Sequence, residues 1–405
     1  MELPDLPLEA ELAEIAERAE PGRTARLAVR HWGWDGRGGA TLEATGREFG
    51  ITRERVRQLC DRLMQRLAAA GSAGGAPAAE AAGQRSIAAP ALDRALVLSA
   101  HAAPTTAHDL ARRLADAHIA TQPFDPAGLL TAAAALTREP TFTLEDVKGV
   151  RAVLPDPPDP GSDTAAVIAA VVDTSRAVVR RAGAARVAEV TGRVAADLAV
   201  WIDDAFVTAV VSEPADFVWL ERRTGWFYLP SVAKNAVVSR VAKVLSVSGA
   251  VRLTDLHEGI RRDERMREFV MPEYVLAELC ERLPGVRVSG ELVVAEPPQT
   301  PHDVLETTEL TLLRLLTEAG GEADRHDLES ACLGAGMKLS SFNNRISYSP
   351  IVKDLGHGRY GLRGTKRAAG PEPPGWDPAG QPAGGSGDTV PRPGDLASFR
   401  PPRRR

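Results

Sequence analysis

Residues Arg30 to Leu67 read RHWGWDGRGGATLEATGREFGITRERVRQLCDRLMQRL, and this stretch predicts two consecutive helices. Thr41 supplies a hydroxyl N-cap for a short helix that should stop at Gly50, because glycine tolerates the positive φ of a turn. Thr52 then caps a longer helix that reaches Leu67. Two helices joined by a glycine turn of about three residues form a helix-turn-helix.

The second predicted helix has an apolar stripe and a polar stripe. The apolar stripe should face the core and consists of Val56, Leu59, Leu63 and Leu67. The polar stripe begins near the helix N-terminus. Arginine suits the O6 and N7 atoms of guanine, glutamine suits adenine, and glutamate accepts from N4 of cytosine. The predicted DNA-binding residues are Arg53, Glu54, Arg57 and Gln58 for base edges, Arg55 and Arg62 for phosphates, and the capping residues Thr41 and Thr52.

A surface helix laced with ion pairs is the alternative interpretation of the same stripe. It predicts a basic residue four positions after Glu54, where Gln58 stands instead. Arg53 and Arg57 also repeat a like charge at that spacing. The charge pattern therefore favours a DNA-reading face.

The charge of this region differs from that of the whole chain, which has 405 residues and a net charge of −5. Residues 1–20 carry seven acids and one arginine, whereas residues 21–70 carry ten arginines and five acids, a net +5. A basic module thus follows an acidic leader, in which Leu8 to Ala19 should form a helix. That helix is either a solvated surface element or one that shields the basic module or binds a partner.

The segment from Thr41 to Leu59 resembles region four of primary sigma factors, the part that reads the upstream (minus-35) promoter element. The resemblance extends back to about residue Pro21. It implies base-contacting roles for the four residues assigned above to base edges. It also implies a backbone-contacting role for Arg62, where the family has a lysine.

Two tryptophans lie where the sigma family has an aromatic–glycine–aliphatic step whose surroundings pack on the flap of RNA polymerase. Trp32 and Trp34 are therefore either core residues or polymerase contacts. Only about 20 residues precede the module, too few for the domain that melts the downstream promoter element. The resemblance thus implies a chain that is not a self-sufficient sigma factor.

Beyond residue 90, four stretches share one plan of three helices followed by a short apolar hairpin. The hairpin glycines Gly149, Gly225, Gly290 and Gly358 lie 76, 65 and 68 residues apart. Three helices and a terminal hairpin over about 65–75 residues are the layout of a winged helix. The predicted fold class is mainly α: a helix-turn-helix domain, tandem winged-helix-like units with small β-hairpin wings, and a disordered tail.

Stretches rich in proline, glycine and alanine set the predicted domain boundaries. The predicted domains are 1–67 (acidic leader helix and sigma region four-like helix-turn-helix), 68–90 (linker), 91–155, 163–230, 231–297 and 300–364 (winged-helix-like units), and 365–405 (disordered tail).

The third helices of the predicted units differ in charge. In the fourth unit this helix offers side chains suited to bases or phosphates, namely Lys338, Ser340, Ser341, Asn343, Asn344 and Arg345. In the third unit it spans Pro272 to Arg282 and carries three glutamates, a poor face for a polyanion. DNA contact stays open for the fourth unit, and protein contact or spacing is favoured for the second and third.

Several classes of function lack the residues that they need. The sequence contains no GxxxxGK[ST], HExxH, CxxC or GxSxG motif, so we predict no enzyme, no cofactor and no metal site. The three cysteines lie far apart, and the acidic N-terminus does not look like a signal peptide. The apolar runs are shorter than the ~18–20 residues of a membrane helix. These features predict a cytoplasmic protein without a membrane partner.

We therefore predict a sequence-specific DNA-binding transcription regulator that reads a promoter-like site on double-stranded DNA, with RNA polymerase as a candidate second partner. The alternative is an adaptor that binds RNA polymerase or another complex through the tandem units, with DNA contact secondary.

Overall fold

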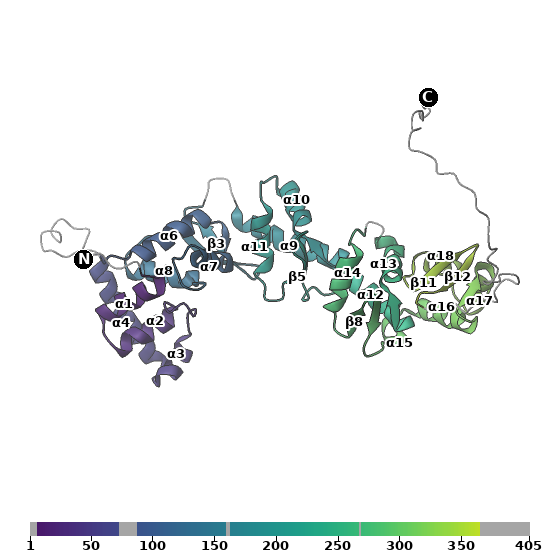
Figure 1. Cartoon of the computed structure of the whole chain (residues 1–405), viewed down its shortest axis with the longest axis horizontal. Coiled ribbons are helices and arrows are strands. Elements are labelled where there is room, and N and C mark those ends of the chain that lie inside the picture. Colours follow the sequence, from purple (N-terminus) through teal and green to yellow (C-terminus); the bar gives the residue numbers. More distant parts are fainter. Residues whose placement is uncertain (1–5, 73–86, 159–162, 267–268, 365–405) are drawn as a thin grey trace, which may run out of the picture. The chain divides into compact units, whose positions relative to one another are not determined.

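The computed structural model describes residues 6–72, 87–158, 163–266 and 269–364 (Figure 1). The described part is mainly helical, with small antiparallel sheets. None of its helices is long and apolar enough to cross a membrane. The predicted tail, 365–405, lies outside the described residues, as does most of the predicted linker.

Residues 6–72 form four helices: α1 (Leu8–Ala19), α2 (Arg23–Trp32), α3 (Leu42–Phe49) and α4 (Arg53–Ser72). The first has the bounds that the sequence predicts. Both threonine caps also form as predicted: Oγ1 of Thr41 accepts from the backbone N–H of Ala44 (3.1 Å), and Oγ1 of Thr52 accepts from that of Arg55 (3.2 Å).

From residue 87 onward, the described chain repeats the order helix, strand, helix, helix, strand, strand four times (Figure 1). Repeat one consists of α6 (Pro90–Ala102), β1 (Thr105–Thr106), α7 (Ala107–Asp116), α8 (Pro126–Ala135), β2 (Phe142–Val147) and β3 (Val150–Pro155). Repeat two consists of α9 (Thr164–Ala182), β4 (Ala185–Arg186), α10 (Val187–Leu198), α11 (Asp204–Ser212), β5 (Val218–Glu221) and β6 (Trp226–Tyr228).

The other two repeats have the same order with small additions. Repeat three consists of α12 (Ala236–Ser248), β7 (Ala250–Arg252), α13 (Leu253–Arg262), the 3-10 turn η1 (Glu264–Met266), α14 (Glu273–Glu281), β8 (Val286–Ser289) and β9 (Leu292–Ala295). The short helix α15 (Pro301–Val304) precedes repeat four, which consists of α16 (Thr307–Glu318), β10 (Glu322–Asp324), α17 (Arg325–Gly334), α18 (Leu339–Tyr348), β11 (Val352–Gly356) and β12 (Arg359–Leu362).

Each repeat closes with a three-stranded antiparallel sheet in which the last strand is central. The orders are β1-β3-β2, β4-β6-β5, β7-β9-β8 and β10-β12-β11. The four predicted hairpins are present, and their glycines Gly149, Gly225, Gly290 and Gly358 all have positive φ. Glycine adopts this conformation without the steric cost that a Cβ atom imposes, which is why it occurs at each turn.

The described residues bury three apolar clusters. One consists mainly of residues of repeats two and three and also takes in Val150, Ala152 and Leu154 from the hairpin of repeat one, and another lies within repeat four. The remaining cluster joins α1, α2 and α4 to repeat one: Leu12 and Leu63 belong to it together with Leu92 and Phe124. The residues on the two sides of the predicted linker therefore share one core.

The acidic leader helix is tied into this core by a buried carboxylate. Glu11 is only 3% exposed, and it accepts hydrogen bonds from the backbone N–H groups of Ala91 and Leu92, both at 2.9 Å. These groups belong to the first turn of α6, where a helix has unpaired donors and favours negative charge. Burial nevertheless raises the pKa of Glu11 above its usual value, while the two backbone hydrogen bonds oppose that rise. Thus α1 packs against repeat one as well as facing solvent.

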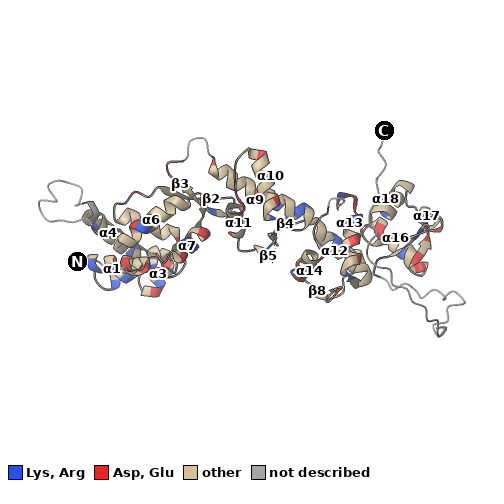
Figure 2. Ribbon diagram, turned by 45° about the horizontal axis from the view of Figure 1, so that its top comes forward, with Lys and Arg blue, Asp and Glu red and all other residues tan. Residues whose placement is uncertain are grey.

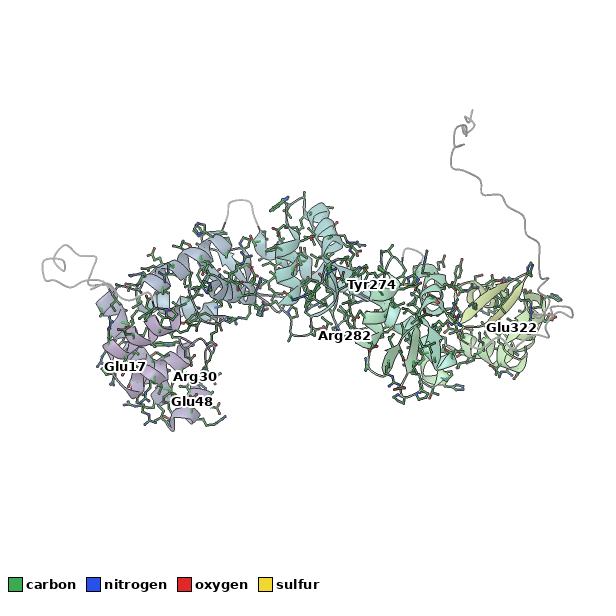
Figure 3. All side chains as sticks on the ribbon, in the orientation of Figure 1. Glu17, Arg30, Glu48, Tyr274, Arg282 and Glu322 are labelled. Carbon is green, nitrogen blue, oxygen red and sulfur yellow. The ribbon has the colours of Figure 1, made fainter. Side chains whose placement is uncertain are left out.

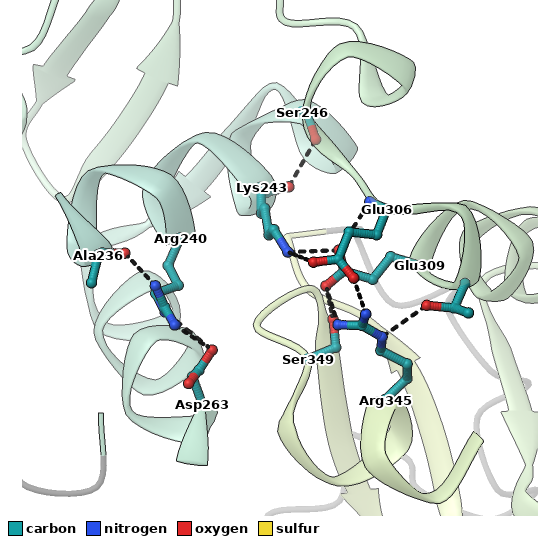
Figure 4. Close-up of polar contacts among 10 residues, drawn as sticks. Ala236, Arg240, Lys243, Ser246, Asp263, Glu306, Glu309, Arg345 and Ser349 are labelled. Atoms are coloured by element: carbon teal, nitrogen blue, oxygen red, sulfur yellow. Dashed lines mark hydrogen bonds and ion pairs between the residues drawn. The ribbon is translucent and has the colours of Figure 1, made fainter. Parts of the chain in front are cut away.

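A second buried carboxylate links repeats three and four (Figure 4). Glu309 of α16 is fully buried and accepts from Nζ of Lys243 (2.7 Å) and from Oγ of Ser349 (2.9 Å). Arg345 of α18 bonds to Oγ1 of Thr308 (2.9 Å) and to the carboxylate of Glu306. Since buried charges need partners, this network holds α12 of repeat three against α16 and α18 of repeat four.

Candidate nucleic-acid interface

The candidate interface is built on the turn between α3 and α4. The backbone N–H of Ile51 donates to the carbonyl of Gly46 at 2.9 Å, and Gly50 takes the left-handed conformation at φ +64°. A Cβ atom added to Gly46 would lie 2.7 Å from the carbonyl oxygen of Ile51. The close approach of α3 to the start of α4 therefore requires glycine at this position.

An arginine from α2 supports the same turn. The guanidinium of Arg23 donates to the carbonyl of Phe49 at the end of α3. Arg30 lies 3.4 Å from the carboxylate of Glu48 and donates to the carbonyl of Gly38 at 2.9 Å (Figure 3). These two arginines were not predicted from the sequence, because their spacing from α3 carries no local signal.

One side of α4 packs on the core, nearly as predicted. Val56, Leu63 and Leu67 are fully buried, whereas Leu59 is half-buried. Cys60, only 4% exposed, completes the buried stripe instead. The spacing 56, 60, 63, 67 follows the 3.6-residue period of a helix, so the place of Cys60 in the buried stripe could have been predicted from the sequence.

The opposite side of α4 faces solvent and carries the predicted DNA-binding side chains. The structure places these on α4 or at a helix cap, and all are exposed: Arg53, Glu54, Arg55, Arg57, Gln58, Arg62, Thr41 and Thr52. Figure 2 shows both basic and acidic positions on α3 and α4. The six residues of α4 thus share one accessible surface, and the two threonines hold the helix ends beside it.

Ion pairs do form on this surface, contrary to the expectation from spacing. Arg57 lies 2.6 Å from the carboxylate of Glu54, three residues before it, and 2.9 Å from that of Asp61, four residues after it. The Arg57 hydrogen bond lowers the pKa of the Glu54 carboxyl below its usual value. The absence of a basic residue four positions after Glu54 does not prevent pairing, because Arg57 reaches an acid on either side of it, at spacings of three and four residues.

These contacts do not block the surface. Pairs between exposed side chains are weak and screened by salt, so a phosphate or base edge can replace them. Within the described residues, the guanidinium groups of Arg53 and Arg62 make no hydrogen bond or ion pair. The predicted phosphate contact Arg62 is therefore free in the absence of DNA, whereas the charge of Arg53 still acts on the Glu54 carboxylate and helps to lower its pKa.

The two tryptophans near α2 are core residues rather than accessible contacts. Trp34 is fully buried and Trp32 is 8% exposed. Their ring centroids are 4.7 Å apart. Of the two interpretations open from the sequence, the structure shows packing in the core.

The third helix of repeat four offers fewer free side chains than its sequence suggests. Asn343 accepts from the guanidinium of Arg325 at 2.7 Å, and Arg345 is engaged with Glu306 and Thr308. Lys338, Ser340 and Asn344 are exposed, and Ser341 is partly exposed.

Neither a protein-family model nor a curated protein matches this chain. The described residues contain no group of three or more His, Cys, Asp or Glu side chains that could hold a metal ion. The case for a function therefore rests on the geometry of α3 and α4 and on the charge of the repeats.

Proposed function

We propose that this chain is a sequence-specific DNA-binding transcription regulator, in which α3 and α4 act as a helix-turn-helix and α4 reads a promoter-like site. The observation that carries the proposal is the exposure, on one side of a capped helix, of residues suited to base edges and phosphates. A core on the opposite side fixes that helix, so the reading side chains are presented by a rigid element.

The side chains divide by role along α4. Arg53, Glu54, Arg57 and Gln58 lie in the first two turns, the part of a recognition helix that contacts base edges in the major groove. Arg55 and Arg62 suit the phosphates on either side of the groove. On binding, Arg57 would exchange its contacts with Glu54 and Asp61 for a guanine, and Glu54 would be free to accept from a cytosine.

The topology of the repeats supports a second part of the proposal. Each repeat has three helices, a short strand after the first helix and a hairpin after the third, and this order supports the prediction of winged-helix-like units. We propose that repeat four, whose third helix follows the N-cap Lys338 and carries exposed serine and asparagine side chains, extends the DNA footprint. RNA polymerase is a candidate partner, which the resemblance to region four of sigma factors implies.

A selection of the full chain on random duplex DNA tests the proposal. Wild type should enrich a short motif. Arg57→Ala should relax one base position, with a loss of discrimination of roughly ten- to hundredfold there. Arg62→Ala should weaken binding to all sequences alike and reduce the salt slope by about one.

The matched control is Arg193→Ala in repeat two, because Arg193 is also exposed and pairs with an acid four residues away, Glu189, at 2.7 Å. This variant should bind the selected site like wild type. A wild-type chain that enriches no motif would refute the proposal.

An adaptor that binds RNA polymerase or another complex is the second candidate function, and one observation favours it. The third helix of repeat three exposes Glu273, Glu278 and Glu281, which repel a phosphate backbone. Association with purified RNA polymerase, together with the absence of an enriched DNA motif, would support the adaptor over the DNA reader.

A further inference from the structure

The loop before the third helix of repeat two exposes large apolar side chains. Trp201 is 87% exposed and Leu198, at the end of α10, is 40% exposed. The next residue along, Ile202, packs against the apolar cluster of repeats two and three. Trp201 therefore contributes almost nothing to the core, although burying a tryptophan is among the largest apolar gains that a chain can make.

Repeat three exposes an apolar side chain at the equivalent position. Trp201 stands two residues before Asp203, the N-cap of α11, and Val270 stands two residues before Pro272, the N-cap of α14. Val270 is 77% exposed. Tyr274, in the first turn of α14, is 52% exposed (Figure 3).

The two outer repeats lack such a side chain there. The same position holds Pro123 in repeat one, before the N-cap Asp125, and Gly336 in repeat four, before the N-cap Lys338. Pro123 is exposed but small, so a large exposed apolar side chain is not required by the repeated fold. Repeats two and three share a large exposed apolar side chain at this position, as expected of a surface that binds another molecule.

The negative charge around Trp201 limits the kinds of partner that can bind there. From Val194 to Glu221 the sequence contains six acids and no lysine or arginine. Asp197, Asp203 and Asp204 are exposed and lie two to four residues from Trp201. An exposed tryptophan can stack on a nucleobase, but these carboxylates repel the phosphates that a nucleic acid would bring.

Two of these carboxylates already have partners within the chain. Asp203 accepts from the backbone N–H of Phe206 at 2.7 Å, and Asp204 accepts from Oγ1 of Thr191 at 2.6 Å. Asp197 makes no hydrogen bond or ion pair with the described residues. It is therefore available to a cation from outside.

We infer that Asp197, Leu198, Trp201 and Asp204 form a docking face, here named the α10–α11 face, for a protein segment in which arginine or lysine flanks an aromatic or aliphatic residue. The apolar residue packs on Trp201 and Leu198, and the cation meets the carboxylates and the negative face of the indole ring. Repeat three shares only the exposed apolar part of this face, through Val270 and Tyr274. This inference goes beyond the proposed DNA reading, which uses α4.

A selection of displayed random 12-residue peptides on the immobilised full chain tests the inference. Enriched peptides should carry net positive charge and at least one aromatic or aliphatic residue. Synthetic copies of them should bind wild type more weakly as salt increases, because ion pairs at a surface are screened.

Two variants localise the binding. Trp201→Ala should weaken the peptide at least tenfold, as expected for the central aromatic residue of an interface. Asp197→Lys should also weaken it while leaving the apolar contacts intact. The matched control is Leu339→Ala, which removes an apolar side chain of 48% exposure at the start of α18 in repeat four and should leave peptide binding unchanged.

The outcomes separate this inference from the proposed function. Arg57→Ala should lose DNA discrimination and keep peptide binding, and Trp201→Ala should do the reverse. The inference is overturned if no peptide is enriched, if the enriched peptides are acidic, or if they bind Trp201→Ala as tightly as wild type. None of these results bears on the DNA motif that α4 selects.

Discussion

The indole Nε1 of Trp34 donates a hydrogen bond of 3.2 Å to the carbonyl of Gly128, a residue of α8 that lies 94 positions further along the chain. This contact joins the segment before α3 to the third helix of repeat one. Gly128 is also tightly packed, because a Cβ atom there would lie 3.2 Å from the carbonyl of Trp32. Repeat one therefore packs against the segment that leads into α3 and α4.

Replacing Trp34 should destabilise α4, although Trp34 does not belong to that helix. Trp34→Ala removes a fully buried ring and should lower the free energy of unfolding by about 3–5 kcal/mol. It should also weaken DNA binding, because α2 and α4 pack in the same cluster. Urea unfolding followed by circular dichroism measures the first effect.

Trp201→Ala is the matched control, since that ring is 87% exposed. Its free energy of unfolding should stay within about 0.5 kcal/mol of wild type. Equal destabilisation by the two substitutions would contradict the packing described for Trp34.

Gly46 should be required for the turn between α3 and α4. In Gly46→Ala the new Cβ would lie 2.7 Å from the carbonyl oxygen of Ile51. Because that oxygen belongs to the backbone, relieving the clash would require α3 and α4 to shift. We expect a loss of about 1–3 kcal/mol in stability and a drop in DNA affinity, although no predicted DNA-contacting residue changes. Thermal unfolding and a DNA titration measure the two effects.

Gly192→Ala is the control, because here the same substitution should raise the stability of the protein. Gly192 lies in α10 with open space around the Cβ position, so alanine should stabilise the protein by about 0.5–1 kcal/mol. If Gly46→Ala behaved like Gly192→Ala, the close approach of α3 to α4 would not exist in solution.

Local patterns predicted the helices α3 and α4 and the four hairpins, because caps and turn glycines act over a few residues. Thr41, Thr52 and Gly149 illustrate this. The first strand of each repeat was not foreseen: β1 and β4 have two residues each, too few to show alternation. The shared core was not foreseen either, since partners 80 to 94 residues apart, such as Glu11 with Ala91, leave no periodic signal.

Asp109 should make stability depend on pH in the acid range. Its side chain is 7% exposed and accepts from Oγ1 of Thr105 (2.9 Å), from Nε of Arg113 (2.6 Å) and from Arg112. Burial alone would raise the pKa of Asp109, but these donors outweigh it and leave the pKa below its usual value.

The sign of the effect follows from this lowered pKa. The stabilisation is present above the ordinary aspartate pKa and is lost as pH falls through the lower folded value. Asp109→Asn should cost roughly 1–3 kcal/mol at pH 7, and the difference from wild type should shrink below about pH 4. Asp116→Asn, at an exposed position of the same helix, should stay within about 0.5 kcal/mol of wild type at pH 7. A difference for Asp109→Asn that grows on acidification would contradict the contacts described here.

The three cysteines should report on the opening of the structure. Burial raises the pKa of the Cys60 thiol to about 12 and that of Cys280 to about 12, and it also raises the pKa of Cys332. The thiolate is the reactive form, so all three should resist an aromatic disulfide reagent at pH 8 in the native protein and react fully in urea. Mass spectrometry of the labelled peptides assigns each site.

The labelling rate of Cys60 then reports how far the buried side of α4 is exposed to solvent. Gly46→Ala and Trp34→Ala should both speed its labelling while leaving Cys280 protected, because Cys280 belongs to the core of repeats two and three. Trp201→Ala should change neither rate. If Cys60 reacted in the native wild-type protein as fast as a thiol in a short peptide, the buried stripe of α4 would be open to solvent, and a recognition helix held rigidly by repeat one would have to be abandoned.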